Sequence, residues 1–180
     1  IQTEPLGLSI SCRGILYAFE IVNLTSESEV DLTLPKNMLP SGVSQITLFN
    51  PKGEILSERL IFTNHQSEMK ITMSQNKNNF QPFEQVSMSF QLNDRKNNPV
   101  QTSFSLAVRD AGTSSVIPYA DNALTNLLLS SELRGYIENP GYYFESNDFR
   151  RKQAMELLLL TQGWKRYEWK EMTGVKPFNP

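Results

Sequence analysis

The 180-residue sequence predicts a mainly β protein of two β-sandwich units, the second of which ends in a pair of helices. Apolar and polar residues alternate in several short segments, and turn-forming residues separate these segments. The alternation stops at Asp110, and leucine-rich segments follow it. Because the polar segment 64–67 separates two series of predicted strands, we expect one unit over residues 1–64 and the other over residues 65–180.

The first unit is expected to contain strands joined by short turns. The apolar segment Ile15–Val22 predicts one strand, and the turn Asn50-Pro51-Lys52-Gly53 joins strands 43–49 and 55–62 in a hairpin. Period-two alternation predicts two further strands, marked by Leu8, Ile10 and Cys12 and by Val30, Leu32 and Leu34. This spacing, with no long helix, is typical of an immunoglobulin-like sandwich. The sequence opens without a methionine, so we expect its earliest strands and any export signal to lie upstream.

The second unit repeats this pattern after the polar gap. The loop 93–99 is dense in turn-forming residues and separates two predicted strands. Alternating apolar residues mark the strands of this unit: Met69, Ile71 and Met73, then Val86, Met88, Phe90 and Leu92, then Phe104, Leu106 and Val108. These segments predict a second sandwich.

Two helices are predicted after the strands. The first covers 121–134, with Asp121 as its N-cap and Gly135 as its stop. The second covers 146–162, with Ser146 able to cap it and Gly163 ending it. Its apolar run Leu157–Leu160 is apolar on nearly every side and is expected to be covered on most of its circumference. The two helices are expected to pack on each other and on the second sandwich.

The segment "IENPGYYFES", residues 137–146, connects the two helices. Its Asn139-Pro140-Gly141 turn reverses the chain, and the apolar and aromatic residues around it are expected to pin the turn to the protein body. The alternative is an aromatic platform for a carbohydrate or peptide ligand. That platform would consist of Tyr136, Tyr142, Tyr143 and Phe144.

Composition and motifs argue against several functions. A net charge of −2 disfavours nucleic-acid and anionic-membrane surfaces, and no apolar run is long enough to cross a bilayer. Cys12 is the only cysteine and His65 the only histidine, so an internal disulfide and a zinc site lack their residues. His65 lies in the polar linker and the sequence has no GxSxG motif, which disfavours a Ser-His-Asp triad. We therefore expect no catalytic residue, cofactor or metal.

Several segments resemble known domains. "LPSGVSQITLFNPKGEILSERLIF" resembles the closing strands of a macroglobulin domain, the immunoglobulin-like unit of the α2-macroglobulin family. "FQPFEQVSMSFQLNDRKNNPVQTSFSLAVRDA" is similar to the core of the next such domain, except that the G-x-P-V hairpin reads Asn97-Asn98-Pro99-Val100 and lacks the glycine. "LTNLLLSSELRGYIENPGYYF" and "AMELLLLTQGWKRYEW" resemble segments of large exported Gram-negative proteins. In those proteins macroglobulin-like domains precede a carboxypeptidase-regulatory-like domain or a TonB-dependent receptor plug.

The resemblance implies a non-catalytic structural or protein-interaction segment of an exported, periplasmic or outer-membrane-associated bacterial protein, linked to TonB-dependent uptake. Its expected partners are other domains of the same polypeptide or envelope proteins. The thioester motif of protease-trapping α2-macroglobulins is missing, because Cys12 is followed by Arg13-Gly14-Ile15.

Overall fold

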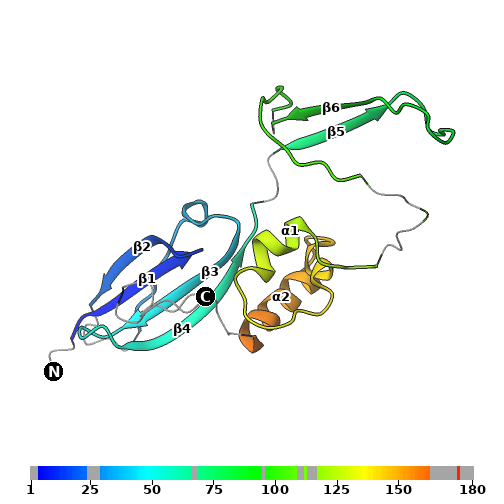
Figure 1. Ribbon diagram of the computed structural model, residues 1–180. Coiled ribbons are helices and arrows are strands. Elements are labelled where there is room, and N and C mark those ends of the chain that lie inside the picture. Colours follow the sequence, from blue (N-terminus) through cyan, green and yellow to red (C-terminus); the bar gives the residue numbers. More distant parts are fainter. Residues whose placement is uncertain are drawn as a thin grey trace. The chain divides into compact units, whose positions relative to one another are not determined.

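The computed structural model describes residues 4–23, 29–65, 69–94, 96–108, 112, 117–162 and 174. These residues confirm a mainly β protein, with one sheet of four antiparallel strands, one of two, and two short α-helices (Figure 1). The chain divides into two compact units, Ile1–Asn64 with Val116–Pro180 and His65–Ser115. Across the described ranges, no helix is both long and apolar enough to span a membrane.

The first unit is built on the antiparallel sheet β2-β1-β3-β4. Its strands are β1 (Leu6–Cys12), β2 (Ile15–Val22), β3 (Gly42–Phe49) and β4 (Ile55–Thr63), which confirms the strands predicted in these segments. Arg13 and Gly14 join β1 to β2 with φ angles of 51° and 73°, and two such angles in succession are typical of a type I′ hairpin turn. In the predicted turn between β3 and β4, Gly53 takes a φ of 78° and donates its N–H to the Asn50 carbonyl at 2.9 Å.

One face of this sheet packs against Leu34 and Leu39 of the segment that follows β2. The core there joins Ile10 and Ala18 to Leu39, with Leu34 packed against it. The strand predicted from Val30, Leu32 and Leu34 is wrong, because residues 29–35 form no strand and only the short 3-10 helix η1 (Lys36–Met38) follows. Period-two alternation fits an extended segment, but a strand also needs a neighbour for its backbone hydrogen bonds, and Val30 and Leu32 are exposed. Leu34 supplies the inward contact without such pairing.

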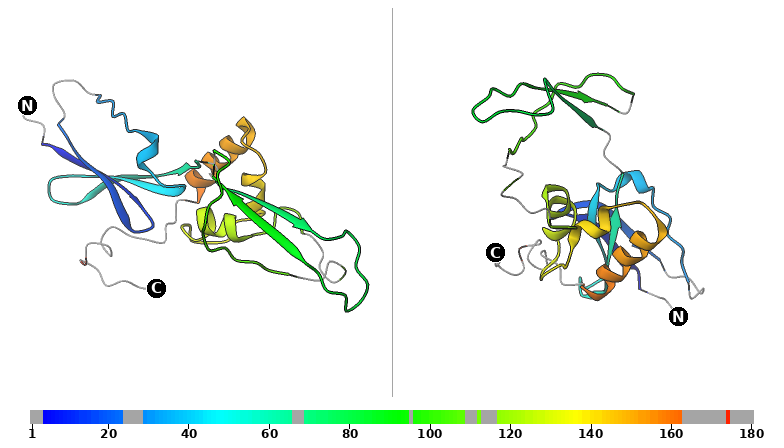
Figure 2. Two further views of the ribbon diagram at one scale, coloured as in Figure 1. Left: turned by 90° about the horizontal axis from the view of Figure 1, so that it is seen from above. Right: turned by 90° about the vertical axis from the view of Figure 1, so that its right-hand side faces the viewer.

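The other face of the sheet packs against the helical segment at the end where β3 begins and β4 finishes (Figure 2). Its elements are α1 (Ala123–Thr125), the π-helix η2 (Asn126–Ser130), the 3-10 helix η3 (Pro140–Phe144) and α2 (Phe149–Thr161). The shared core consists of Val43, Leu60, Leu129, Leu133, Ile137, Met155 and Leu159. The helices therefore belong to the first unit, which corrects the expectation that they pack on the second. Periodicity identifies the apolar side of a helix but not the surface that covers it.

The helix termini differ from the predicted ones. Asn122 rather than Asp121 caps α1, since its side chain accepts from the backbone N–H groups of Leu124 and Thr125. Asp148 caps α2 by accepting from the Arg151 N–H at 2.9 Å, while Ser146 donates to Asp148 at 2.7 Å. The predicted stop at Gly163 lies outside the described residues. Both helices start later than predicted because the residues before each cap stay outside the helix, and the first helical segment also ends earlier, at Ser130.

The apolar run at the end of α2 is only partly covered. Leu159 is 3% exposed and Leu158 packs beside the core, whereas Leu157 and Leu160 are 55% and 59% exposed. The expectation of cover on most of the circumference is therefore wrong. The helix meets the first unit on one side, so Leu158 and Leu159 face the core and Leu157 and Leu160 are exposed.

The second unit contains the hairpin of β5 (Lys70–Gln75) and β6 (Met88–Asn93). Asn97 in the following loop takes a φ of 64°, a left-handed conformation that asparagine tolerates better than most residues. The strand predicted around Phe104 is not formed over residues 100–108. The start of a pairing with β6 is present: Asn93 forms a bridge with Pro99, and the Val100 N–H donates to the Leu92 carbonyl at 2.9 Å.

Candidate functional site

The connector between the helices contains the aromatic residues singled out in the sequence. Asn139 precedes η3 with a φ of 50°, and Pro140 occupies the first turn, where its missing N–H costs no hydrogen bond. The Gly141 N–H donates to the Tyr119 carbonyl at 2.9 Å. A Cβ on Gly141 would lie 2.8 Å from Tyr119 Cα, so only glycine fits this approach without a shift.

Two of the predicted aromatic residues belong to the packing of the first unit. Tyr143 and Phe144 lie against the core shared by the helices and the sheet, and Phe144 meets Phe62 of β4 edge to face at 5.6 Å between ring centroids. Burial raises the pKa of the Tyr143 hydroxyl above its ordinary value. These rings therefore hold the connector to the sheet.

Tyr142 is enclosed by other side chains of the connector and its neighbours. The Arg151 guanidinium carbon lies 4.2 Å from the Tyr142 ring centroid, a cation–π contact. The Tyr119 and Tyr143 rings meet Tyr142 edge to face at 5.8 and 5.6 Å. The Tyr142 ring thus contacts one cation and two aromatic rings.

Glu145 joins the same cluster through hydrogen bonds. It accepts from the Arg151 guanidinium and, at 3.1 Å, from the Tyr119 hydroxyl. The bond from Arg151 and then the bond from Tyr119 hold the pKa of Glu145 below its usual value, and the bond to Glu145 raises the pKa of Tyr119. Sequence analysis missed Tyr119, Glu145 and Arg151, since no spacing rule relates them.

Tyr136 is separate from this cluster. It is 83% exposed, whereas Tyr142, Tyr143 and Phe144 are half-buried. The carbonyl of Tyr136 accepts from the Gln162 side chain at 2.6 Å, which ties the connector to the end of α2. The predicted platform residues are therefore placed in two different environments.

Other candidate residues lie apart from the aromatic cluster. Cys12 is buried at the end of β1, and burial is the main cause that raises the pKa of its thiol. A small open hollow beside it is lined partly by Arg13, Gln45 and Glu132. Arg13 donates there to the Ser41 and Leu127 carbonyls at 3.1 and 3.2 Å, so it ties the β1–β2 turn to the helical segment. Within the described ranges, no group of three His, Cys, Asp or Glu side chains could hold a metal ion.

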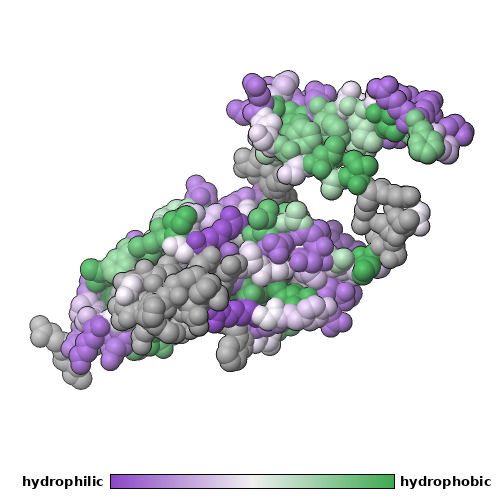
Figure 3. Space-filling model, in the orientation of Figure 1, coloured by the Kyte–Doolittle hydropathy of each residue, from purple (hydrophilic) through white to green (hydrophobic). Residues whose placement is uncertain are grey.

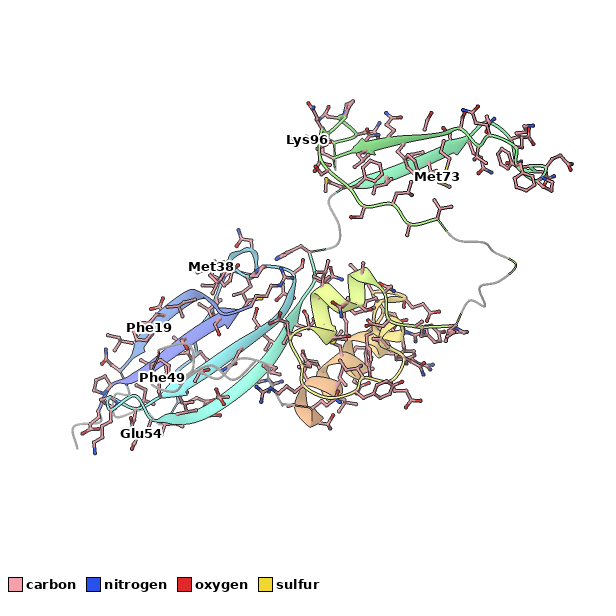
Figure 4. All side chains as sticks on the ribbon, viewed as in Figure 1. Phe19, Met38, Phe49, Glu54, Met73 and Lys96 are labelled. Atoms are coloured by element: carbon pink, nitrogen blue, oxygen red, sulfur yellow. The ribbon has the colours of Figure 1, made fainter. Side chains whose placement is uncertain are left out.

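The second unit exposes a continuous apolar sheet face (Figures 3 and 4). Ile71 pairs with Leu92 and Met73 with Phe90, so these side chains share one side of the hairpin. Ile71 and Met73 are exposed, and the Phe104 ring lies 5.3 Å from that of Phe90. The opposite side carries only polar or charged residues: Lys70, Thr72, Ser74, Ser89, Gln91 and Asn93.

Comparison with known proteins gives no assignment: no family model matches the chain, and no curated protein or solved structure is significantly similar to it.

Proposed function

We propose that the chain is a non-catalytic structural and protein-interaction segment whose two units are parts of macroglobulin-like β-sandwiches. The observation that carries this proposal is the apolar face of the β5–β6 hairpin, formed by Ile71, Met73, Phe90 and Leu92. An isolated hairpin is at best marginally stable in water, and burial of each large apolar side chain contributes about 1.5–3 kcal/mol. A facing apolar sheet would supply that burial and complete a sandwich.

One side of the hairpin is apolar and the other is polar, and this difference favours a protein as the partner. A ligand-binding surface needs several polar groups that orient the ligand. This face is apolar at the Ile71–Leu92 and Met73–Phe90 pairs, and its polar residue Gln75, beside Met88, donates to the Asn78 side chain. Its chemistry therefore suits another sheet, contributed by other domains of the same polypeptide or by an envelope protein. Exposed apolar patches of this kind mark protein interfaces.

The exported location and the link to TonB-dependent uptake rest on the sequence resemblance. The hairpin loop is consistent with it, because Asn97 stands at the glycine of the G-x-P-V pattern and adopts the left-handed conformation that glycine favours. Fractionation of the producing cells, with an antibody to the chain, tests this location. Recovery in the cytoplasm alone would refute it.

The proposed absence of catalysis follows from the residue inventory. Acid–base catalysis near neutral pH usually draws on histidine or on a carboxylate or lysine with a shifted pKa. The carboxylate of Glu145 has a pKa shifted downward by Arg151, so it stays ionised and paired rather than poised to exchange a proton. Elemental analysis and a panel of glycosidase and peptidase substrates test the proposal. Turnover that is lost when a single Asp or Glu is replaced would contradict it.

The alternative, a carbohydrate- or peptide-binding surface, has one supporting observation. Tyr136 is almost fully exposed and could stack on a sugar ring or a peptide side chain. The rings of Tyr142, Tyr143 and Phe144 make the internal contacts described above, which favours the structural role for them.

Photo-crosslinking tests the interaction role in the protein as its cells produce it. A benzophenone amino acid at position 73 is expected to crosslink to an apolar strand of another domain or protein, identified by mass spectrometry. The same group at position 72, on the polar side of β5, serves as the matched control. Equal crosslinking at the two positions would refute the proposal that this face is an interface.

A further inference from the structure

We infer that the free edge of β2 accepts an extended peptide strand in which a lysine or arginine stands between two apolar residues. This inference rests on the proposed role in protein interaction and names the chemistry of one partner. The sheet order places β2 at an edge, so its outer backbone N–H and C=O groups face away from β1. Such groups are satisfied when a partner adds a strand to the sheet.

The side chains of β2 favour such an addition. Phe19 and Ile21 are 49% and 64% exposed and share one face of the sheet, where they pair with Ser9 and Gly7 of β1. The Phe49 ring of β3 lies over Gly7 and stacks on Phe19 at 5.9 Å between ring centroids (Figure 4), so Phe19 and Ile21 form the outer apolar border of that face. Apolar residues of an added strand would pack against this border.

The two halves of β2 are protected against edge pairing in different ways. The register shifts between Ile10 and Ser11, which pair with Ala18 and Leu16, so Tyr17 is an extra residue that forms a bulge. Such a bulge hinders pairing near the turn. The segment Ala18–Val22 continues in regular register with β1 and contains neither lysine nor proline. Its one charged residue is the exposed Glu20, which protects this half of the edge against any strand that does not carry a cation opposite it.

Glu20 determines the charge of the partner. It lies on the opposite face from Phe19 and Ile21, pairs with the apolar Leu8, and is exposed. Among the described residues no salt bridge to Glu20 is found, whereas Arg59 of β4 is already paired with Glu156 of α2 at 3.2 Å. A cation directly across from Glu20 would form a favourable cross-strand pair, and an anion there would be repelled. The other edge, β4, is flanked by α2, so β2 is the favoured acceptor.

Two end-blocked peptides, TIKIT and TIEIT, test this inference on the isotope-labelled whole chain by NMR. We expect TIKIT at millimolar concentration to shift backbone amides of β2, and to bind roughly two- to fivefold more tightly than TIEIT, from the usual size of cross-strand charge pairs. Glu20→Lys should reverse this preference. Glu138→Lys makes the same change in charge at an exposed residue of the connector and should leave the preference unaltered.

Each result decides the inference. Absence of amide shifts in β2, or a peptide preference that Glu20→Lys leaves unchanged, would overturn it. Reversal by Glu138→Lys as well would show a long-range charge effect and would also overturn it. The crosslinking experiment on β5 does not involve Glu20. A negative peptide titration would therefore leave the proposed function standing, and a negative crosslinking result would not bear on β2.

Discussion

Gly141 lies where the connector comes closest to the rest of the first unit. Its Cβ position is 2.8 Å from Tyr119 Cα and 2.9 Å from Tyr119 C, and these backbone atoms cannot rotate away as a flexible side chain could. We therefore expect Gly141→Ala to lower the free energy of unfolding by about 1–3 kcal/mol, the usual cost of overpacking. Urea unfolding followed by circular dichroism measures this change.

A glycine that is open to solvent provides the control for this substitution. Gly53 has nothing within 4 Å of its Cβ position, and its φ of 78° is one that asparagine tolerates. Gly53→Asn is therefore expected to change stability much less than Gly141→Ala. Equal losses would show that crowding at Tyr119 is not the cause.

The Glu145 carboxylate should make stability depend on pH. Bonds from Arg151 and Tyr119 lower its pKa in the folded protein below the ordinary 4.5. Its contribution is therefore present above pH 4.5 and is lost as the pH falls through the folded-state pKa. Urea unfolding at a series of pH values should show that Glu145→Gln flattens the loss of stability below pH 4.5.

Other carboxylates with lowered pKa, such as Asp148, add to the same acid-induced loss. The informative quantity is thus the difference between wild type and Glu145→Gln, with Glu138→Gln as a second exposed carboxylate of the connector for comparison. A pH profile identical for wild type and Glu145→Gln would mean that the cluster does not persist in solution.

At this scale the sequence predicts which residues pack but not what they contact. The aromatic residues of the connector stand out by composition, and Tyr143 and Phe144 do pack on the core. Their neighbour Tyr119 bonds to Glu145, which lies 26 residues away, and neither residue belongs to a pattern. Contacts at such separations depend on the three-dimensional path of the chain.

The helix α2 provides a sharp test of the packing between elements. Leu159 is 3% exposed in the core with Val43 and Leu60, whereas the next residue, Leu160, is 59% exposed. Leu159→Asp should cost several kcal/mol, comparable with the ~5–15 kcal/mol stability of a typical domain, because a carboxylate would be buried without a partner. Leu160→Asp introduces the same charge at the next position of the same helix and should change the free energy of unfolding very little, because that side chain is exposed.

Hydrogen exchange locates the effect of these two variants. Leu159→Asp should release the protection of β3 and β4 amides, since these strands contribute Val43 and Leu60 to the same core. Loss of protection confined to β5 and β6 would instead place α2 on the second unit. Similar stability of the two variants would contradict the packing described for α2.

Elements with local signals were the predictable ones. The hairpin of β3 and β4 has a local signal in Asn50 and Gly53, which form its turn. The segment around Val30 and Leu32 has the alternation of a strand, yet these side chains are exposed and the backbone pairs with no strand. Alternation identifies an extended segment, while membership of a sheet depends on distant neighbours.

On the scale of the whole molecule, the order of segments in the sequence hides how they group in space. The first unit combines Ile1–Asn64 with Val116–Pro180, and His65–Ser115 stands between these two parts as a compact unit of its own. Strand periodicity restarts after Asn64, and this restart reveals a boundary between two units. It does not reveal that the chain later returns to the first unit. Val43 and Leu60 are apolar residues on the sheet face opposite the one that packs against Leu34 and Leu39. These two residues therefore need cover from a later part of the chain.

This grouping predicts the behaviour of two shortened proteins. Replacing residues 66–115 with a glycine–serine linker of about ten residues, which can span up to ~33 Å, should leave a folded first unit with the core of sheet and helices intact. A protein that ends at Asn64 loses the cover of Val43 and Leu60 and should unfold or aggregate.

Thermal unfolding and light scattering distinguish the two proteins, and Leu159→Asp placed in the linker-joined protein completes the test. If the sheet and helices form one cooperative unit, that substitution should remove the cooperative transition, because Leu159 shares its core with strands on the far side of the excised segment. A fragment 1–64 that melts cooperatively as a monomer would show that the sheet does not need the helices. The division of the chain would then be linear, with each unit formed by consecutive residues.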